Sequence, residues 1–303
     1  WAARVTLTTM QTMSLQEALR ETRDRLATLG EDAVREAQHL LTACLGIPSI
    51  VLHTEPEKAL TPAQLAKLRD WAQRRAAGEP LAYLTGKREF WSLDFIVNSS
   101  VLVPRPETEV LVERVLLHGD ALTSLGAQTI RVADLGTGSG IIAITVAHER
   151  PHWQCTAVDL SAEALTVARQ NAHNLVADRV TFAQGSWLEP LAGERFDLIA
   201  SNPPYVDSAD PVLSGDSLAF EPRLALTAGA DALAALNHLV DHAPDHLTDG
   251  GWLCLEHGTD QGAAVRARLV ARGYAHVVSH RDLAGHERVT EAQWLQTNNR
   301  TSG

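Results

Sequence analysis

The sequence contains few cysteines and no apolar run long enough to cross a membrane. Its three cysteines, Cys44, Cys155 and Cys254, are odd in number, widely spaced and set in apolar stretches. That pattern favours buried thiols in a reducing compartment over a disulfide framework or a zinc site. No apolar run approaches the roughly 20 residues that span a bilayer, and the N-terminus lacks the apolar core and cleavage site of a secretory signal. We therefore expect a globular, cytoplasmic protein.

The chain is also short of positive charge. Residues 1–85 hold ten Lys/Arg and ten Asp/Glu, whereas residues 86–303 hold 16 and 27 and so carry the whole net charge of −11. Proteins that bind a nucleic-acid backbone usually show the opposite sign, and no run of Lys/Arg interleaved with aromatic residues is present. The acidity disfavours a polyanionic substrate, although it can also serve solubility alone.

A length of 303 residues suits two domains, or one large domain with an appendage. We expect residues 1–13 to be a disordered leader, with Met10 or Met13 as a candidate start, and residues 297–303 to be a disordered tail. The scattered cysteines and the histidine pattern lead us to predict no metal site.

Residues 14–85 are expected to form a small helical domain that recognises the substrate. Ser14 and Glu17 form a capping box at the start of an amphipathic segment that we expect to end at Gly30. Two further helices are predicted over residues 32–46 and 61–78, the second beginning with Thr61 and Pro62.

The remaining sequence has an α/β pattern. Residues 86–106 are predicted to form a hairpin that links the domains, with "NSS" as its turn. From residue 107 to 296 strands alternate with amphipathic helices, which indicates a mainly parallel sheet with helices on both faces. Only eight residues separate the last two strands, too few for a helix, so we expect these two to pair antiparallel. The predicted strands are 130–135, 154–160, 180–185, 196–202, 251–257, 275–280 and 289–295.

A glycine-rich loop follows the first of these strands. Gly136, Gly138 and Gly140 have the spacing G-x-G-x-G, which is not the dinucleotide-binding fingerprint. Asp134 before the loop would repel a pyrophosphate and suits a ligand with a cationic amino-acid end. Asp159 closes the second strand, where a carboxylate can accept both hydroxyls of a ribose. The pattern predicts S-adenosylmethionine as the cofactor; the alternative is an ordinary tight turn.

The sequence "NPPY" ends the fourth strand, and its two prolines make a rigid turn. At the carboxyl ends of parallel strands this turn would face the cofactor. The side-chain oxygen of Asn202 and the carbonyl of Pro203, stiffened by Pro204, could accept both N–H bonds of a planar nitrogen and aim its lone pair at a methyl group. Tyr205 would supply a wall for a planar group. The alternative is a simple turn initiated by Asn-Pro.

The "NPPY" turn behind a glycine-rich loop resembles methyltransferases that act on planar nitrogen: adenine N6, cytosine N4 and glutamine N5. The stretches "REFWSLDFIV", "VLVPRPETE", "DLGTGSGIIAI", "SNPPYV", "EPRLAL", "LEHGTDQG" and "GHERVT" are similar, in order, to the bacterial peptide chain release factor glutamine methyltransferases, the HemK-like family. The resemblance covers about residues 14–295. It implies a seven-stranded class I methyltransferase domain behind a helical domain, acting on the glutamine N5 of the Gly-Gly-Gln loop in release factors 1 and 2. We expect a monomer, although the sequence does not show the oligomeric state.

The resemblance also implies roles for individual residues. Many members carry an Asp before the tryptophan of "GSW", and here Ser186 could bond adenine without bringing charge. Trp187 would lie against the adenine, or it is a core residue. Glu221 and Arg223 would form a flap, or a salt-bridged surface loop. The expected cofactor-binding residues are Asp134, Leu135, Gly136, Thr137, Gly138, Gly140, Asp159, Leu160, Ser186, Trp187 and Asn202. The expected substrate-binding residues are Asn202, Pro203, Pro204 and Tyr205. Arg105 and Glu107 would either shape a peptide channel or cap the next helix.

Two other functions stay open at this point. One is an adenine-N6 methyltransferase that acts on DNA or RNA, which the acidic second half of the chain disfavours. The other is a cofactor-binding protein without turnover, in which the helical domain docks a partner.

Overall fold

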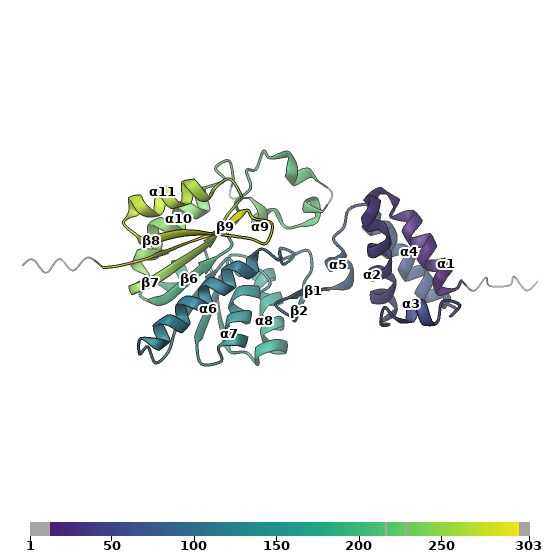
Figure 1. The fold of residues 1–303 in the computed structure, drawn as a ribbon, viewed down its shortest axis with the longest axis horizontal. Coiled ribbons are helices and arrows are strands. Elements are labelled where there is room, and N and C mark those ends of the chain that lie inside the picture. Colours follow the sequence, from purple (N-terminus) through teal and green to yellow (C-terminus); the bar gives the residue numbers. More distant parts are fainter. Residues whose placement is uncertain (1–12, 216, 228, 297–303) are drawn as a thin grey trace, which may run out of the picture. The chain divides into compact units, whose positions relative to one another are not determined.

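The computed structural model describes residues 13–215, 217–227 and 229–296, and the chain falls into two compact units, Trp1–Thr85 and Gly86–Gly303 (Figure 1). The predicted leader and tail lie outside the described residues, apart from the last residue of the leader. None of the described helices is both long and apolar enough to span a membrane. The three cysteines are free and buried, as predicted.

The first unit is a bundle of helices whose apolar faces pack together. The predicted capping box is confirmed: the Ser14 side chain accepts a hydrogen bond from Glu17 N, and Glu17 accepts one from Ser14 N at 2.9 Å. The first helix ends at Arg25 and not at Gly30, because the chain then tightens into a 3-10 turn. The elements are α1 (Leu15–Arg25), η1 (Ala27–Asp32), α2 (Ala33–Leu45), α3 (Val51–Thr54), α4 (Pro62–Ala76) and α5 (Leu81–Thr85).

The second unit is built on a seven-stranded sheet with the order β5-β4-β3-β6-β7-β9-β8. All neighbours are parallel except the two pairs that β9 makes. The predicted α/β class and the antiparallel pairing of the last two strands are confirmed. The strands of this sheet are β3 (Arg131–Leu135), β4 (Gln154–Asp159), β5 (Val180–Gln184), β6 (Phe196–Ser201), β7 (Leu247–Glu256), β8 (Ala275–Arg281) and β9 (Glu287–Gln293).

Helices cover both faces of this sheet, with an apolar core between each layer and the sheet. In Figure 1, α6, α7 and α8 lie on one face and α10 and α11 on the other. The helices are α6 (Thr108–Ser124), α7 (Ile141–Glu149), α8 (Ala162–Val176), α9 (Arg223–Leu226), α10 (Ala234–His242) and α11 (Gly262–Arg272), with 3-10 turns η2 (Glu189–Leu191), η3 (Pro211–Ser214), η4 (Leu218–Phe220) and η5 (Ala243–Asp245).

The hairpin between the predicted domains is shorter than the sequence indicated. Its strands are β1 (Lys87–Phe90) and β2 (Leu93–Ile96), and its turn is formed by Trp91 and Ser92, with φ values of 55° and 58°. A turn does form at "NSS", where Val101 N donates to Asn98 O at 3.2 Å and Ser100 N to Asn98 Oδ1 at 2.9 Å, but it follows the hairpin, so the prediction that it is the hairpin's own turn was wrong. Two-residue turns with two positive φ values usually contain Asn or Gly, so neither Trp91 nor Ser92 signalled the hairpin turn.

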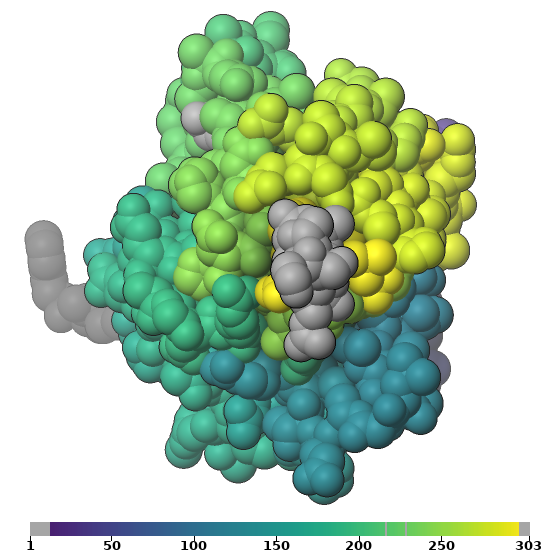
Figure 2. Space-filling view, turned by 90° about the vertical axis from the view of Figure 1, so that its left-hand side faces the viewer, coloured from purple at the N-terminus to yellow at the C-terminus, as the bar shows by residue number. Residues whose placement is uncertain are grey.

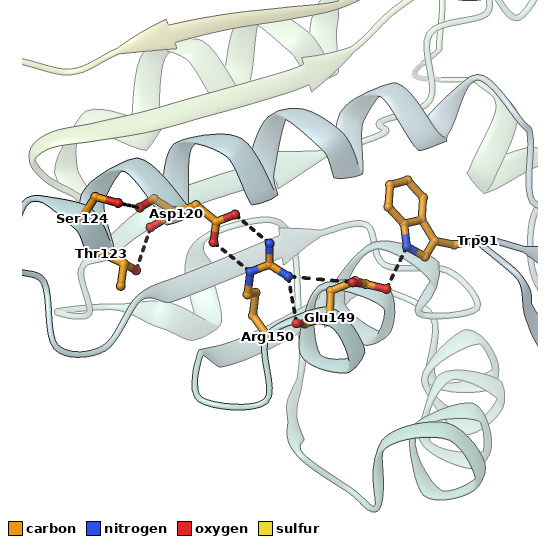
Figure 3. A network of polar contacts seen from close by, with 7 residues as sticks. Trp91, Asp120, Thr123, Ser124, Glu149 and Arg150 are labelled. Carbon is orange, nitrogen blue, oxygen red and sulfur yellow. Dashed lines mark hydrogen bonds and ion pairs between the residues drawn. The ribbon is translucent and has the colours of Figure 1, made fainter.

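Side-chain contacts fix the hairpin against the sheet-bearing unit. Figure 3 shows the Trp91 indole donating to Glu149 Oε1 at 3.0 Å, beside Arg150, whose guanidinium pairs with Asp120 on α6 at 2.6 Å. On α8 the buried Asn171 donates to Ile96 O at 3.0 Å and accepts from Ile96 N at 2.7 Å. The turn geometry that sequence could not predict is thus held by long-range contacts.

Glu291 on β9 joins helix α6 to the antiparallel edge of the sheet. It pairs with Arg114 at 2.7 Å, and the imidazole nitrogens of His118 and His280 lie 2.9 and 3.0 Å from its carboxylate. Burial alone raises the pKa of Glu291, but the hydrogen bonds from His118 and Arg114 outweigh it and bring the pKa to about 2. Figure 2 shows the blue surface that contains α6 adjoining the yellow C-terminal surface.

This carboxylate gives a test of the fold. Because its pKa lies below the unfolded value of 4.5, the stability that Glu291 contributes is present above pH 4.5 and is lost as pH falls towards 2. We expect Glu291→Gln to lower the free energy of unfolding at pH 7 by on the order of 3 kcal/mol, and by less at pH 4. Urea unfolding at both pH values measures this.

The matched control is Glu194→Gln, because Glu194 pairs with Arg131 at an exposed position. That change is expected to cost less than about 1 kcal/mol. An equal loss in the two variants, or a loss at Glu291 that does not depend on pH, would contradict the assigned role.

Candidate active site

The glycine-rich loop connects β3 to α7, as predicted. Gly136, Gly138 and Gly140 have φ values of 74°, 56° and 88°, in the left-handed region that glycine adopts without strain. A Cβ atom on Gly140 would also lie 2.5 Å from Ile144 Cδ1. Since Gly140 is the N-cap of α7, the loop leads directly to backbone N–H groups that have no partner within the helix.

Asp134 accepts hydrogen bonds from the glycine-rich loop and from α7, and it does not line the cavity at this end of the sheet. It is fully buried, and its Oδ2 accepts from Thr137 Oγ1 at 2.6 Å and from Ala143 N at 3.1 Å. Burial raises its pKa to about 7, and Asp159 adds to the rise, while the Thr137 and Ala143 bonds act against it. Direct contact between Asp134 and a ligand stays a prediction; the observed contacts fix the loop.

Asp159 lies at the end of β4, beside the loop. Its Oδ2 accepts from Gly138 N at 2.8 Å and its Oδ1 accepts from Ser161 N at 2.9 Å. A carboxylate has about four acceptor positions, so Asp159 keeps capacity to accept a ligand hydroxyl beside its backbone hydrogen bonds. Burial raises the pKa of Asp159, although backbone bonds oppose the rise.

The strand ends bring the predicted motifs together. Leu135 is the register partner of Val158 on β4 and of Ser201 on β6, and Ser201 Oγ donates to Leu135 O at 2.6 Å. The loop after β3, Asp159 and Asn202 therefore lie at one edge of the sheet, as the sequence predicted from the rule for parallel strands.

A cavity of about 510 Å³ opens at this edge, within the range of small-molecule sites. It is lined by most of the predicted residues: Arg105, Gly136, Thr137, Gly138, Asp159, Leu160, Ser186, Trp187, Asn202 and Pro204. Leu135, Gly140, Pro203, Tyr205 and Glu107 do not line it. Tyr205 packs against the core, and its carbonyl accepts from Gln261 at 3.0 Å, so its predicted role as a wall of the substrate site stays untested.

Trp187 serves both the core and the cavity. It packs on the apolar cluster between the sheet and α10, and it also lines the cavity. A Cβ atom on Gly136 would lie 3.4 Å from its ring, so the ring covers the glycine loop closely. The two alternatives considered for this residue are therefore not exclusive.

Glu221 joins two walls of the cavity by a buried ion pair. Its Oε1 accepts from Arg105 Nη2 at 2.5 Å and its Oε2 accepts from Val103 N at 2.9 Å, and its side chain has no exposed area. Residues of segments 100–105 and 222–227 line the cavity. The expected surface salt bridge is thus a buried one, between Glu221 and Arg105 and not Arg223, which is exposed.

Several cavity residues were not predicted. Thr108 begins α6, and Ala234, Ala235 and His238 come from α10. Apolar periodicity identifies such helices but does not show which turn borders a ligand. His238 and His242 also form an H-x-x-x-H pair that our sequence interpretation passed over; their rings stack at 4.2 Å, and no three metal-binding side chains gather anywhere in the described part of the chain.

Asn171 is a second unpredicted residue of consequence. Besides holding Ile96, its Nδ2 donates to Ser139 O at 2.9 Å in the glycine loop. A buried asparagine on an amphipathic helix signals a polar contact but not its partner. Here it couples the hairpin to the loop.

Comparison with known proteins covers both units. The family described as PrmC N-terminal domain matches residues 17–86, and the Methyltransferase small domain matches residues 111–214. Three proteins named release factor glutamine methyltransferase are similar over nearly their full length. They come from Vibrio cholerae (45% identity, 93% of this chain and 97% of that one), Salmonella typhimurium (45%, 91% and 96%) and Pseudomonas aeruginosa (47%, 86% and 92%).

Solved structures agree at the level of the fold. The catalytic domain of hMettl16, in complex with MAT2A 3'UTR hairpin 1, superposes with a TM-score of 0.54 and 17% identity, covering 76% of this chain and 82% of that one. The likeness supports the methyltransferase fold of the second unit and nothing finer.

The Glu221 pair gives a test of the cavity walls. We expect Glu221→Ala to leave the fold intact and to loosen residues 207–226, because Arg105 and Val103 N lose their acceptor. Hydrogen bonds to charged groups contribute about 1.5–3 kcal/mol, so cleavage of this segment in limited proteolysis should become about tenfold to a hundredfold faster. The control is Arg223→Ala, next to the pair but exposed. Equal cleavage of both variants would refute the role of the pair.

Proposed function

The chain belongs to the family of release factor glutamine methyltransferases, and from this premise we propose that it methylates the side-chain amide N5 of a release-factor glutamine. The proposed methyl donor is S-adenosylmethionine, and the proposed substrate is the Gly-Gly-Gln loop of release factors 1 and 2. The observation that carries the proposal is the cavity at the sheet edge, where Asp159, the glycine loop and Asn202 meet. A reaction on translation factors would take place in the cytoplasm.

The residues of the cavity fit the proposed cofactor. Asp159 keeps capacity to accept a ribose hydroxyl beside its backbone hydrogen bonds. The loop glycines allow the backbone to approach a ligand closely, and Trp187 with Ser186 offers a flat face and a hydroxyl for adenine. The cofactor supplies an electrophilic methyl group on a sulfonium. The acidic pair Asp134 and Asp159 favours the positive charge of such a ligand.

Asn202 is the proposed anchor for the glutamine amide. The nitrogen of an amide is a poor nucleophile, because its lone pair is delocalised. An acceptor on each N–H bond would turn the nitrogen and stabilise the positive charge that develops on it. Oriented positioning of this kind can supply about 7–11 kcal/mol. The transfer would exchange the S–C bond of the donor for a new N–C bond, and the proton lost by the amide nitrogen would pass to water.

The acidity of the second unit supports a protein substrate over a nucleic acid. A loop that works against ribosomal RNA would itself be basic, and its attraction to an acidic surface would weaken as salt rises. We propose that the helical unit, residues 14–85, recognises the body of the release factor. The acidic second half of the chain disfavours the adenine-N6 alternative.

Mass spectrometry of a release factor incubated with this protein and isotope-labelled cofactor tests the function. We expect one labelled methyl group on the loop glutamine and none on adenine of added DNA or RNA. A short peptide with Gly-Gly-Gln should be methylated with a much lower kcat/KM than the intact factor, because it offers nothing to the helical unit. No label on glutamine would refute the proposal.

Substitution of Asn202 tests its assigned role. Asn202→Ala should lower kcat by about a hundredfold or more, since it removes a dipole aimed at the reacting nitrogen, and should leave cofactor affinity nearly intact. Ser208→Ala is the control, because Ser208 is exposed and does not line the cavity. Unchanged turnover in Asn202→Ala would contradict the assignment.

A further inference from the structure

Glu256 is a buried carboxyl beside the candidate site that the proposed reaction does not yet use. It is the last residue of β7 and is 1% exposed. Leu255 is the register partner of Ser201, so the next residues along the two strands, Glu256 and Asn202, stand side by side. Glu256 does not line the cavity, and therefore cannot touch a substrate bound there.

Three side chains form a cluster at this point: Thr108, Asn202 and Glu256. Asn202 Nδ2 donates to Thr108 Oγ1 at 3.2 Å. Thr108 and Asn202 also lower the pKa of Glu256 and so favour its charged form, and the buried Oε2 of Glu256 has no hydrogen-bond partner. Thr108 and Asn202 both line the cavity, so Glu256 stands behind them.

The chemistry of the three groups fixes the direction of the Asn202 amide. An ionised carboxylate only accepts hydrogen bonds, whereas an amide has one donor end and one acceptor end. Thr108 Oγ1 accepts one N–H of the Asn202 amide, and a carboxylate beside that NH₂ group would favour it and disfavour the amide oxygen at the same place. An alanine or a leucine at position 256 would allow either orientation.

We propose that Glu256 is a positioning residue, which holds Asn202 with Nδ2 inward and Oδ1 towards the cavity, where that oxygen accepts an N–H of the substrate amide. The inference rests on the proposed function. In this proposal Glu256, which lies outside the cavity, sets the orientation of the Asn202 amide, and substrate binding depends on that orientation.

The protonation state of Glu256 then controls the orientation of the Asn202 amide. Burial raises the pKa of Glu256 to about 7, and the charge of Glu107 adds to this rise. Thr108, Asn202 and Arg288 act against it. Tyr205 also faces this carboxyl, since the charge of Glu256 contributes to the raised pKa of that phenol. A protonated carboxyl can donate to Asn202 Oδ1 and permit the reversed amide, so kcat should rise with pH through about 7.

Kinetics from pH 6 to 9 test the proposal in the full-length protein. Glu256→Gln should lower kcat at pH 8 by about tenfold to a hundredfold, the usual cost of losing a supporting hydrogen-bond partner, should leave the KM for the cofactor unchanged, and should abolish the rise near pH 7. The pKa of Asp134 is also raised to about 7. Loss of the rise in kcat in Glu256→Gln is therefore the result that assigns this rise to Glu256. Glu291→Gln, an equal change at a buried carboxylate that pairs with Arg114 on α6, should keep the rise.

A second measurement does not depend on turnover. The carboxyl of Glu256 can be titrated by ¹³C NMR and identified by its absence in Glu256→Gln. Asn202→Ala should raise its pKa further, because a bond that favours the charged form is lost; an unchanged pKa would overturn the proposed contact. If the wild type methylates glutamine while Glu256→Gln keeps its rate and pH profile, the inference fails and the function stands. If glutamine is not methylated at all, the function fails and the titration still decides the contact.

Discussion

The candidate site depends on one constraint: a carboxylate removed from water must find hydrogen-bond donors or cations in the fold. Asp134 ties the glycine loop through Thr137 and Ala143, and Asp159 ties the same loop through Gly138. Glu221 joins two cavity walls through Arg105 and Val103 N. In each case the groups that donate to the carboxylate belong to another part of the site, so these hydrogen bonds also set the geometry of the cavity; Asp134 Oδ1 is buried without a partner.

The parallel sheet makes this arrangement possible, because it brings the carboxyl ends of separate strands to one edge. The ends of β3, β4, β6 and β7 supply Asp134, Asp159, Ser201 and Glu256. Side chains far apart in the sequence can therefore share donors. The two prolines after Asn202 stop β6 from continuing, so the amide remains at the edge, in front of Glu256, and is not drawn into the sheet.

Local sequence features predicted the strands, the glycine loop, the capping box of α1 and the meeting of Asp159 with Asn202, because each has a nearby chemical signal. The failures share a different cause. The turn at Trp91 and Ser92 lacks the usual turn residues. Trp91 in the turn is held by Glu149, 58 residues away, and Ile96 at the other end of the hairpin is held by Asn171, 75 residues away. The Glu221 pair joins residues 116 apart. No local pattern reports a partner at that distance, so Asn171, Glu221 and Glu256 could be recognised only in the fold.

The buried carboxylates also differ in a way that bears on the ligand. Glu291, away from the cavity, lies against Arg114 and two histidines, and its pKa is brought to about 2. Asp134 and Asp159 border the glycine loop, and no lysine or arginine is among the described groups that set their pKa values, which are raised. Folding therefore loses stability as pH rises from about 4 to 7 through Asp134. A ligand with a positive charge at this loop would favour the ionised forms and return that stability on binding. At Glu291 the fold itself supplies a positive charge, from Arg114. At the glycine loop a bound cationic ligand would supply it.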